Sequence, residues 1–114
     1  MTARTSDEDR FWDLAGSLLD RPGVSRSTMM GYPCLRLDGD FFASWDPAHE
    51  RLVVKLDAAR ASALIDAGRA EPFAPNGRRF KEWVSVPATK RRSWGRLLDD
   101  AFERAVTRAA SAEG

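Results

Sequence analysis

Cationic side chains interleaved with aromatic rings are the feature of this chain whose residue types and spacing could do chemistry. Arg78, Arg79, Lys81 and Trp83 fall within the run RRFKEW, directly after an Asn-Gly pair that predicts a turn. Guanidinium and ammonium groups pair with phosphate oxygens, and a flat indole can stack on a nucleic-acid base. The run therefore predicts a surface that binds DNA or another nucleic acid, largely through backbone phosphates.

Further cations would join this surface if the run forms a strand beside the hairpins that precede it. Alternation along each strand would place these side chains on one polar face with Tyr32: Arg36, Arg51, Lys55, Arg79, Lys81 and Trp83. The competing interpretation is that an open sheet face is polar in any case, and that Trp83 packs beneath a helix or connector. The residues we expect at the interface are Arg36, Lys55, Arg78, Arg79, Lys81 and Trp83.

Charge is distributed unevenly although the whole chain of 114 residues carries a net charge of only +1. Residues 76–96 hold seven Arg and Lys against one carboxylate, a net charge of +6. Part of this segment, Lys90-Arg91-Arg92 with Arg96, could grip a phosphate backbone, but a solvated charge run beside a helix start is the commoner meaning. GC-rich coding could also account for the excess of arginine over lysine, so clustering is the better guide.

Catalytic and metal-binding patterns are missing from the sequence. The single His49 lies between Asp46 and Glu50, but one histidine and one cysteine in the whole chain make a zinc site improbable. Cys34 lies in a predicted strand with no assignable base, which is typical of a small core residue. No dinucleotide-binding, P-loop or nucleophile-elbow motif occurs. We expect no catalytic residue, metal or cofactor, and no enzymatic activity.

The chain is organised around residues 32–56, which predict three strands joined by two tight turns. Asp38-Gly39 suits a two-residue hairpin with positive φ, and Asp46-Pro47 suits a type I turn with a carboxylate acceptor. Strict alternation would place the following side chains on the core face: Leu35, Leu37, Phe41, Ala43, Trp45, Leu52, Val54 and Leu56. Residues 78–86 predict a fourth strand, with Phe80, Val84 and Val86 on one side.

Three helices are predicted around these strands. Residues 6–20 begin with a Ser6 cap, residues 57–67 begin with an Asp57 cap and stop at Gly68, and residues 90–110 carry a long apolar stripe. The last helix could be capped by Ser93 rather than Thr89, because three cations oppose the helix dipole in its first turn. Met29 and Met30 are expected to fill space beside the sheet, and the connector 69–77 is expected to be irregular.

These elements predict an α+β domain spanning residues 1–114, ordered over about 6–110. Its sheet would be mostly antiparallel and four-stranded, a three-strand meander plus one strand, packed with three helices in the order α-β-β-β-α-β-α. The chain shows neither a signal peptide nor an apolar run of the roughly 20 residues that cross a bilayer. We expect a cytoplasmic protein without a membrane partner, and a monomer rather than an obligate oligomer.

Several motifs carry a resemblance to a known family. They are Met30-Gly31-Tyr32-Pro33, Gly39 with Phe42-Ala43, Lys55-Leu56, and the strand from Lys81 to Trp83-Val84. In order and spacing the chain resembles the YjbR/MmcQ family over roughly residues 8–107, and more distantly the N-terminal domain of the competence regulator TfoX. The resemblance implies a small α+β fold and a DNA-binding role that, for many members, rests on fold analogy.

The expected function is therefore that of a small non-enzymatic binding module, with DNA or another nucleic acid as its partner. Contact would be electrostatic and largely insensitive to base sequence. The alternative is a protein-interaction or accessory domain without a nucleic-acid role, in which the sheet face or the last helix receives a protein partner.

Overall fold

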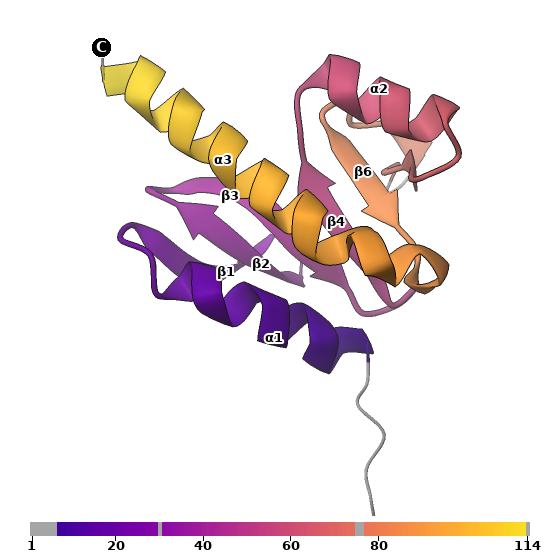
Figure 1. Cartoon of the computed structure of the whole chain (residues 1–114), viewed down its shortest axis with the longest axis horizontal. Coiled ribbons are helices and arrows are strands. Elements are labelled where there is room, and N and C mark those ends of the chain that lie inside the picture. The colour runs from indigo at the N-terminus through magenta and orange to yellow at the C-terminus, as the bar shows by residue number, and fades with distance from the viewer. Residues whose placement is uncertain (1–6, 30, 75–76, 114) are drawn as a thin grey trace, which may run out of the picture.

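The structure consists of a six-stranded antiparallel sheet with three α-helices (Figure 1). It is a computed structural model that describes residues 7–29, 31–74 and 77–113. The α-helices are α1 (Asp7–Leu19), α2 (Ala58–Asp66) and α3 (Trp94–Glu113), and a 3-10 helix, η2 (Ala88–Ser93), precedes α3. The strands are β1 (Val24–Met29), β2 (Tyr32–Leu37), β3 (Asp40–Asp46), β4 (Arg51–Lys55), β5 (Glu71–Pro72) and β6 (Trp83–Val86).

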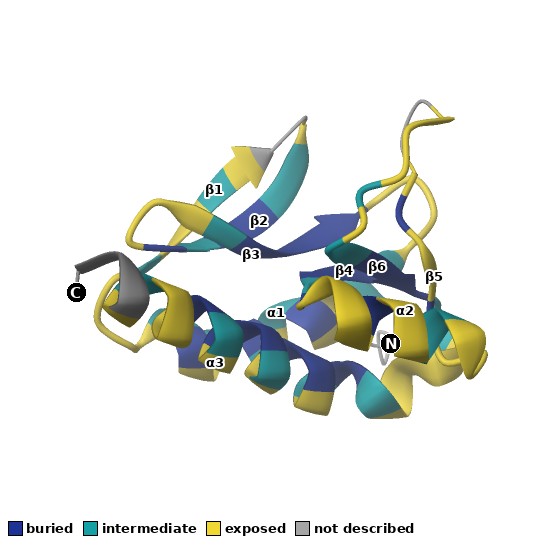
Figure 2. Cartoon of the chain, turned by 90° about the horizontal axis from the view of Figure 1, so that it is seen from above, coloured by how far each residue is buried: buried dark blue, intermediate teal, exposed yellow. Residues whose placement is uncertain are grey.

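The helices cover one face of the sheet, whose strand order is β1-β2-β3-β4-β6-β5 (Figure 2). Their buried sides face the strands, while the segment between β5 and β6 lies on the opposite side of the sheet (Figure 2). The predicted α+β class with antiparallel strands is thus confirmed. The predicted count of four strands is wrong, because the sheet is longer at both edges.

Both additional strands lie where the sequence pattern is weak. β1 pairs with β2 along its whole length, from Val24 opposite Leu37 to Met29 opposite Tyr32. Its residues VSRSTM are mostly polar, as is common for a strand at the edge of a sheet. The turn after β1 includes Gly31 at φ +82° and lacks the Asn-Gly or Asp-Gly pair that marks a hairpin in a sequence. β5 has only two residues, Glu71 and Pro72, opposite Ser85 and Val84. Its proline is tolerated because β5 is the other edge.

The two predicted turns are confirmed. Asp38 and Gly39 have φ of +50° and +94°, the positive values that a tight hairpin of this kind requires. The Asp46 carboxylate accepts hydrogen bonds from the backbone N–H groups of Ala48 (3.1 Å) and His49 (3.2 Å). This side chain therefore fixes the turn between β3 and β4 as an Asx acceptor.

A β-bulge changes which residues of β3 face the core. Leu35 lies opposite Ala43 and Arg36 lies opposite Phe41, so Phe42 is the extra residue of the bulge. Phe42 is buried and contacts Phe102 of α3, whereas Phe41 lies beside the Arg36 guanidinium at 5.1 Å. The prediction that Phe41 faces the core is wrong for this reason.

The core lies between the sheet and helices α1 and α3. Trp45 sits at its centre, 5.7 Å from the ring of Phe11 in α1 and 5.6 Å from the ring of Trp94 in α3. The Trp94 indole N–H also donates to the Val86 carbonyl at 3.1 Å, which ties the start of α3 to β6. A buried indole whose polar atom is satisfied fixes the helix on the sheet without a desolvation penalty.

The helix ends agree with the sequence only in part. Ser6 lies outside the described residues. Asp57 does occupy the position before α2, but its side chain makes no capping hydrogen bond and instead accepts one from Arg104 at 2.8 Å. Gly68 follows α2 at φ +73° as predicted, because glycine adopts this left-handed conformation without strain.

The third helix begins later and buries less than the sequence predicts. η2 occupies Ala88–Ser93, so α3 starts at Trp94, directly after Ser93. The Ser93 hydroxyl donates to the Lys90 carbonyl at 2.8 Å. Residues from Trp94 to Ala105 bury the predicted stripe, but Val106 is 39% exposed. The C-terminal part of α3 extends beyond the sheet (Figure 1).

Candidate nucleic-acid interface

The predicted interface lies on the face of the sheet opposite the helices. Val54 and Val84 point into the core, so their neighbours Lys55 and Trp83 point to the opposite side. The register places Lys55 directly across from Trp83. Arg36 lies two strands away, across from Phe41. Three of the six predicted residues therefore share this face.

A loop packs over the middle of this face. We call residues 73–82 the covering loop, of which the structure describes 73–74 and 77–82. Phe73 is its anchor, only 5% exposed, with its ring 6.4 Å from Tyr32, 6.0 Å from Phe80 and 6.3 Å from Trp83. The four rings form one aromatic cluster on the loop side of the sheet, where a small hydrophobic cluster beneath a loop excludes water.

Backbone hydrogen bonds hold the covering loop in this shape. The Phe80 N–H donates to the Phe73 carbonyl and the Trp83 N–H to the Phe80 carbonyl, both at 3.0 Å. The Leu56 N–H donates to the Glu82 carbonyl at 2.7 Å. Residues 78–80 are therefore irregular and 81–82 form a turn, so that the predicted strand begins only at Trp83. The prediction that Phe80 shares a side with Val84 is also wrong, since Phe80 lies with Phe73.

This packing limits what Trp83 can do. Its indole is half-buried and tilted against Phe73 with an interplanar angle of 51°. The sequence left open whether Trp83 is exposed or packed beneath the connector, and the structure places it against the connector. A ring that already packs on its neighbours offers an edge rather than a free stacking platform to a base.

The cations of the covering loop are exposed. The Arg78 guanidinium lies 5.7 Å from the centre of the Phe80 ring. Arg79 and Lys81 are exposed, and within the described part of the chain neither side chain has a hydrogen bond or ion pair. Charged groups without a local partner remain available to an external anion, with an attraction that salt weakens. These three side chains extend the polar surface around the aromatic cluster.

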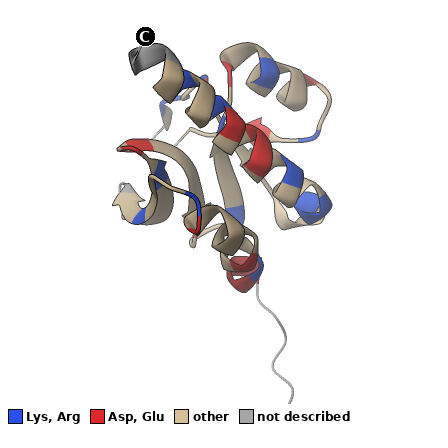
Figure 3. Ribbon diagram, turned by 60° about the vertical axis from the view of Figure 1, so that its left-hand side comes forward, with Lys and Arg blue, Asp and Glu red and all other residues tan. Residues whose placement is uncertain are grey.

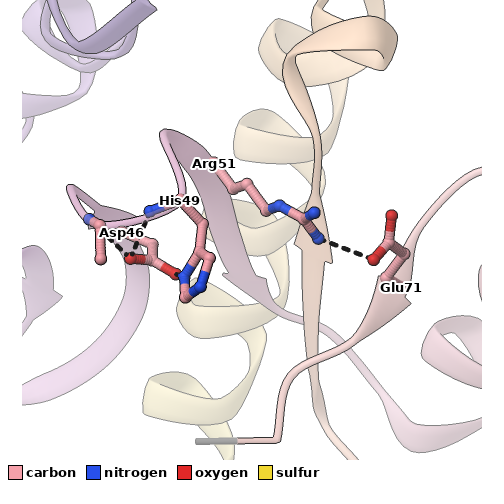
Figure 4. A network of polar contacts seen from close by, with 5 residues as sticks. Asp46, His49, Arg51 and Glu71 are labelled. Carbon is pink, nitrogen blue, oxygen red and sulfur yellow. Dashed lines mark hydrogen bonds and ion pairs between the residues drawn. The ribbon is translucent and has the colours of Figure 1, made fainter.

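The remaining predicted cations are more constrained. Arg36 donates to the Gly39 carbonyl through Nε (3.3 Å) and an η nitrogen (3.2 Å), so it stabilises its own hairpin. Lys55 is half-buried beside Trp83. Arg51, at the other end of β4, pairs with Glu71 at 2.7 Å (Figure 4). The predicted cations thus lie in two groups: Arg78, Arg79 and Lys81 are exposed on the covering loop, whereas Arg36 and Lys55 lie on the strands, the first bonded to its own hairpin and the second half-buried.

A pocket of about 260 Å³ lies beside the covering loop, next to Tyr32 and Asp46. Asp46 is buried, and its second carboxylate oxygen lies 2.9 Å from His49 Nδ1 (Figure 4). Burial, reinforced by the nearby Asp46 charge, raises the pKa of the Tyr32 phenol. Because Asp46 is already engaged by backbone amides and His49, the arrangement is explained by its role in the turn.

An ion-pair network joins the covering loop to the helices. Arg104 of α3 contacts Asp57 at 2.8 Å and also binds the Glu82 carboxylate, and Arg108 lies 3.6 Å from that same carboxylate. The Arg104 side chain is only 10% exposed. Glu82 therefore fixes the end of the covering loop to α3, a role that its place in the cationic run did not suggest.

The second cationic run of the sequence lies on the helix side of the molecule. Two adjoining depressions, of about 580 and 300 Å³, lie between α2 and the η2–α3 junction and share Arg69 and Ser93. We call them the basic groove, whose cations are Arg60, Arg69, Lys90, Arg91, Arg92 and Arg96. In Figure 3 cationic segments gather at the end of α3 opposite the marked C-terminus. Arg69 is isolated in the sequence, so only the fold could place it here.

No group of three or more His, Cys, Asp or Glu side chains among the described residues is arranged to hold a metal ion. None of the helices in the described ranges combines the length and apolar character needed to cross a bilayer.

Comparison with known proteins gives one match. The sequence profile of the YjbR family matches residues 19–104, most of the chain. No curated protein and no solved structure matches. The match includes the sheet, the covering loop and most of α3, and it agrees with the motifs on which the resemblance was based. The chain is a member of the YjbR family.

Proposed function

We propose that this YjbR-family chain is a non-enzymatic binding module that contacts nucleic acid through the covering loop. One observation supports this most: Arg78, Arg79 and Lys81 are exposed on a loop held by Phe73, and the described residues include no carboxylate paired with them. Because the backbone of the loop is already held, binding to phosphate groups would order mainly these side chains and not the loop itself.

The expected mode of binding is electrostatic. Lys and Arg side chains contact backbone phosphates and release counterions, which gives affinity with little dependence on base sequence. Lys55 and Arg36 would contribute at the margin, since one is half-buried and the other bonds to its own hairpin. Trp83 would support the loop and present an edge to the ligand.

Fluorescence anisotropy with a labelled duplex and a labelled single strand, over a series of salt concentrations, tests the proposal. Arg79→Ala and Lys81→Ala are each expected to weaken binding about threefold to tenfold and to reduce the salt slope by about one unit. Arg10→Ala is the matched control, because Arg10 is an exposed cation on α1. If the loop variants bind as the wild type does, or if Arg10→Ala weakens binding equally, the covering loop is not the interface.

A second candidate function is that of a protein-interaction domain, favoured by one observation. Val106 is exposed on the C-terminal part of α3. An apolar side chain at the projecting end of a helix could anchor a protein partner. A complex that persists in high salt and is lost in Val106→Glu, but not in Arg79→Ala, would support this function over nucleic-acid binding.

A further inference from the structure

The basic groove is separate from the covering loop and has its own charge balance. The residues that line its two depressions include no Asp or Glu. Two of its cations are engaged, Arg60 with Asp100 at 2.8 Å and Arg91 with the Ala88 carbonyl at 2.9 Å and Asp7 at 3.9 Å. Within the described ranges the side chains of Arg69, Lys90, Arg92 and Arg96 have no such partner.

The backbone that carries these cations is firmly placed. On one wall, the Arg69 N–H donates to the Leu64 carbonyl at 2.9 Å, so the residue is held at the end of α2. On the other wall, the Lys90 N–H donates to the Pro87 carbonyl at 2.9 Å. Directly after this run of cations, the fully buried Trp94 fixes the start of α3 to the core. The fold therefore fixes the backbone positions from which these cations line the groove.

This arrangement is electrostatically unfavourable in the absence of an anion. The positive end of the 20-residue helix α3 begins beside the groove, where Lys90, Arg91 and Arg92 add like charge. Like charges at short range repel, and the repulsion is relieved when phosphate oxygens bind between them. An anion that carries several charges would therefore bind this site more tightly than an anion that carries one.

We propose that the basic groove binds the phosphate chain of a compact polyphosphate, as found in a nucleoside triphosphate or in a short inorganic polyphosphate. The larger depression, about 580 Å³, lies within the size range of sites for small molecules. Its concave form suits a short flexible chain of phosphates that can be surrounded by cations. This binding goes beyond the proposed contact of the covering loop with nucleic acid and does not depend on it.

Isothermal titration calorimetry of the full chain with tripolyphosphate tests the proposal. The variant that combines Arg69→Gln and Arg92→Gln is expected to weaken tripolyphosphate binding by at least about tenfold. The matched control combines Arg79→Gln and Lys81→Gln on the covering loop, and is expected to change this affinity less than about twofold. Near-ultraviolet circular dichroism checks that each variant is folded. If the first variant is not, the pair Lys90→Gln and Arg96→Gln replaces it.

Two further ligands identify the source of the phosphates. Equal affinity for ATP and tripolyphosphate would mean that the phosphate chain alone is read, and tighter binding of ATP would mean that the nucleoside also contacts the groove. Citrate, a compact anion without phosphate, is expected to bind more weakly. The proposal is overturned if tripolyphosphate does not bind, or if citrate binds as tightly as tripolyphosphate does. It is also overturned if both double variants weaken tripolyphosphate binding equally.

The two proposals can fail independently. In the duplex-binding assay, the loop variant (Arg79→Gln with Lys81→Gln) is expected to lose affinity. The groove variant (Arg69→Gln with Arg92→Gln) is expected to retain most of its affinity, which is the reverse of the calorimetric result. Loss of duplex binding in the groove variant alone would assign nucleic acid to the groove and overturn both the proposed use of the covering loop and the separate role of the groove.

Discussion

The two faces of the sheet are buried by different kinds of structure. On the helix side, α1 and α3 lay apolar stripes along the strands, and Trp45, Trp94 and Phe11 pack at the centre. On the loop side, Cys34, Ser44 and Val53 are fully buried, and the cover on this face is a short irregular segment, the covering loop, rather than a helix. The ring of Phe73 lies at the centre of the aromatic cluster on this side and contacts the rings of Tyr32, Phe80 and Trp83.

The two faces differ in how many side chains hold the cover in place. A helix face shares its burial among many side chains, so the loss of one ring leaves the helix in place. The covering loop depends on Phe73 and on a few hydrogen bonds, so it can open while the rest of the molecule stays folded. Exposed functional side chains are commonly placed on such loops, held by a rigid scaffold.

The largest effect is expected on the helix side. Trp45→Ala should lower the free energy of unfolding by about 3–5 kcal/mol, because it leaves a cavity between α1, α3 and the sheet. Urea denaturation followed by circular dichroism measures the change. Phe41→Ala is the control, since Phe41 is half-buried on the other face, and should cost about 1 kcal/mol. A loss from Trp45→Ala no larger than that of the control would contradict the described core.

The loop side should respond locally. Phe73→Ala is expected to cost about 2–3 kcal/mol, since the aromatic cluster loses its central ring. Cleavage by trypsin should speed up at Arg78, Arg79 and Lys81, because they lie on the covering loop that Phe73 anchors. Timed digestion followed by mass spectrometry locates the cuts. If Phe73→Ala instead speeds up cleavage equally at sites throughout the chain, the two faces are one cooperative unit and the comparison fails.

The parts of the fold that could be predicted are those where local pattern and tertiary packing agree. The stripes of α1 and α3, the Asp38-Gly39 hairpin and the Asp46 turn follow from periodicity and turn chemistry. β1 was missed because a polar edge strand is specified by its partner, and β5 because a two-residue strand has no periodicity. The bulge at Phe42 shifts alternation by one residue, which strict alternation along β3 does not anticipate.

The candidate interface was predictable in composition but only partly in geometry. The covering loop keeps Arg78, Arg79 and Lys81 exposed, as the charged run indicates. The position of Trp83 depends on Phe73, ten residues earlier in an irregular connector, and no local rule pairs the two. The basic groove depends on Arg69 meeting the run at Lys90–Arg92, a contact that only the placement of α2 beside η2 creates.

The third prediction concerns the connection between the two faces. Arg104→Leu keeps part of the apolar stem but removes the ion pairs that join α3 to Glu82 and Asp57. The expected loss is about 1 kcal/mol, since the Asp57 side chain is 76% exposed and that of Glu82 is 41% exposed, so water partly screens both ion pairs. Arg108→Leu, a more exposed neighbour on the same carboxylate, should cost less than about 0.5 kcal/mol. Urea denaturation at low and high salt measures both, and equal losses would mean that Arg104 is not the main link.

The smallest expected effect is a pH dependence that arises from two groups on the loop side of the sheet. Burial raises the pKa of the Cys34 thiol above its ordinary value of 9.0, although Arg36 and the Ser27 backbone partly oppose the shift. A raised pKa means that the folded state favours the neutral thiol, so the stabilisation is fully present below about pH 9 and is lost as the pH rises through the folded-state pKa. Tyr32 adds a similar loss that begins near its ordinary value of 10.0. Denaturant unfolding under reducing conditions between about pH 8 and about pH 10 should therefore show a shallower decline of stability in Cys34→Ala than in the wild type. Identical slopes would mean that the thiol is solvated, and that the covering loop shields the sheet less completely than the helices do.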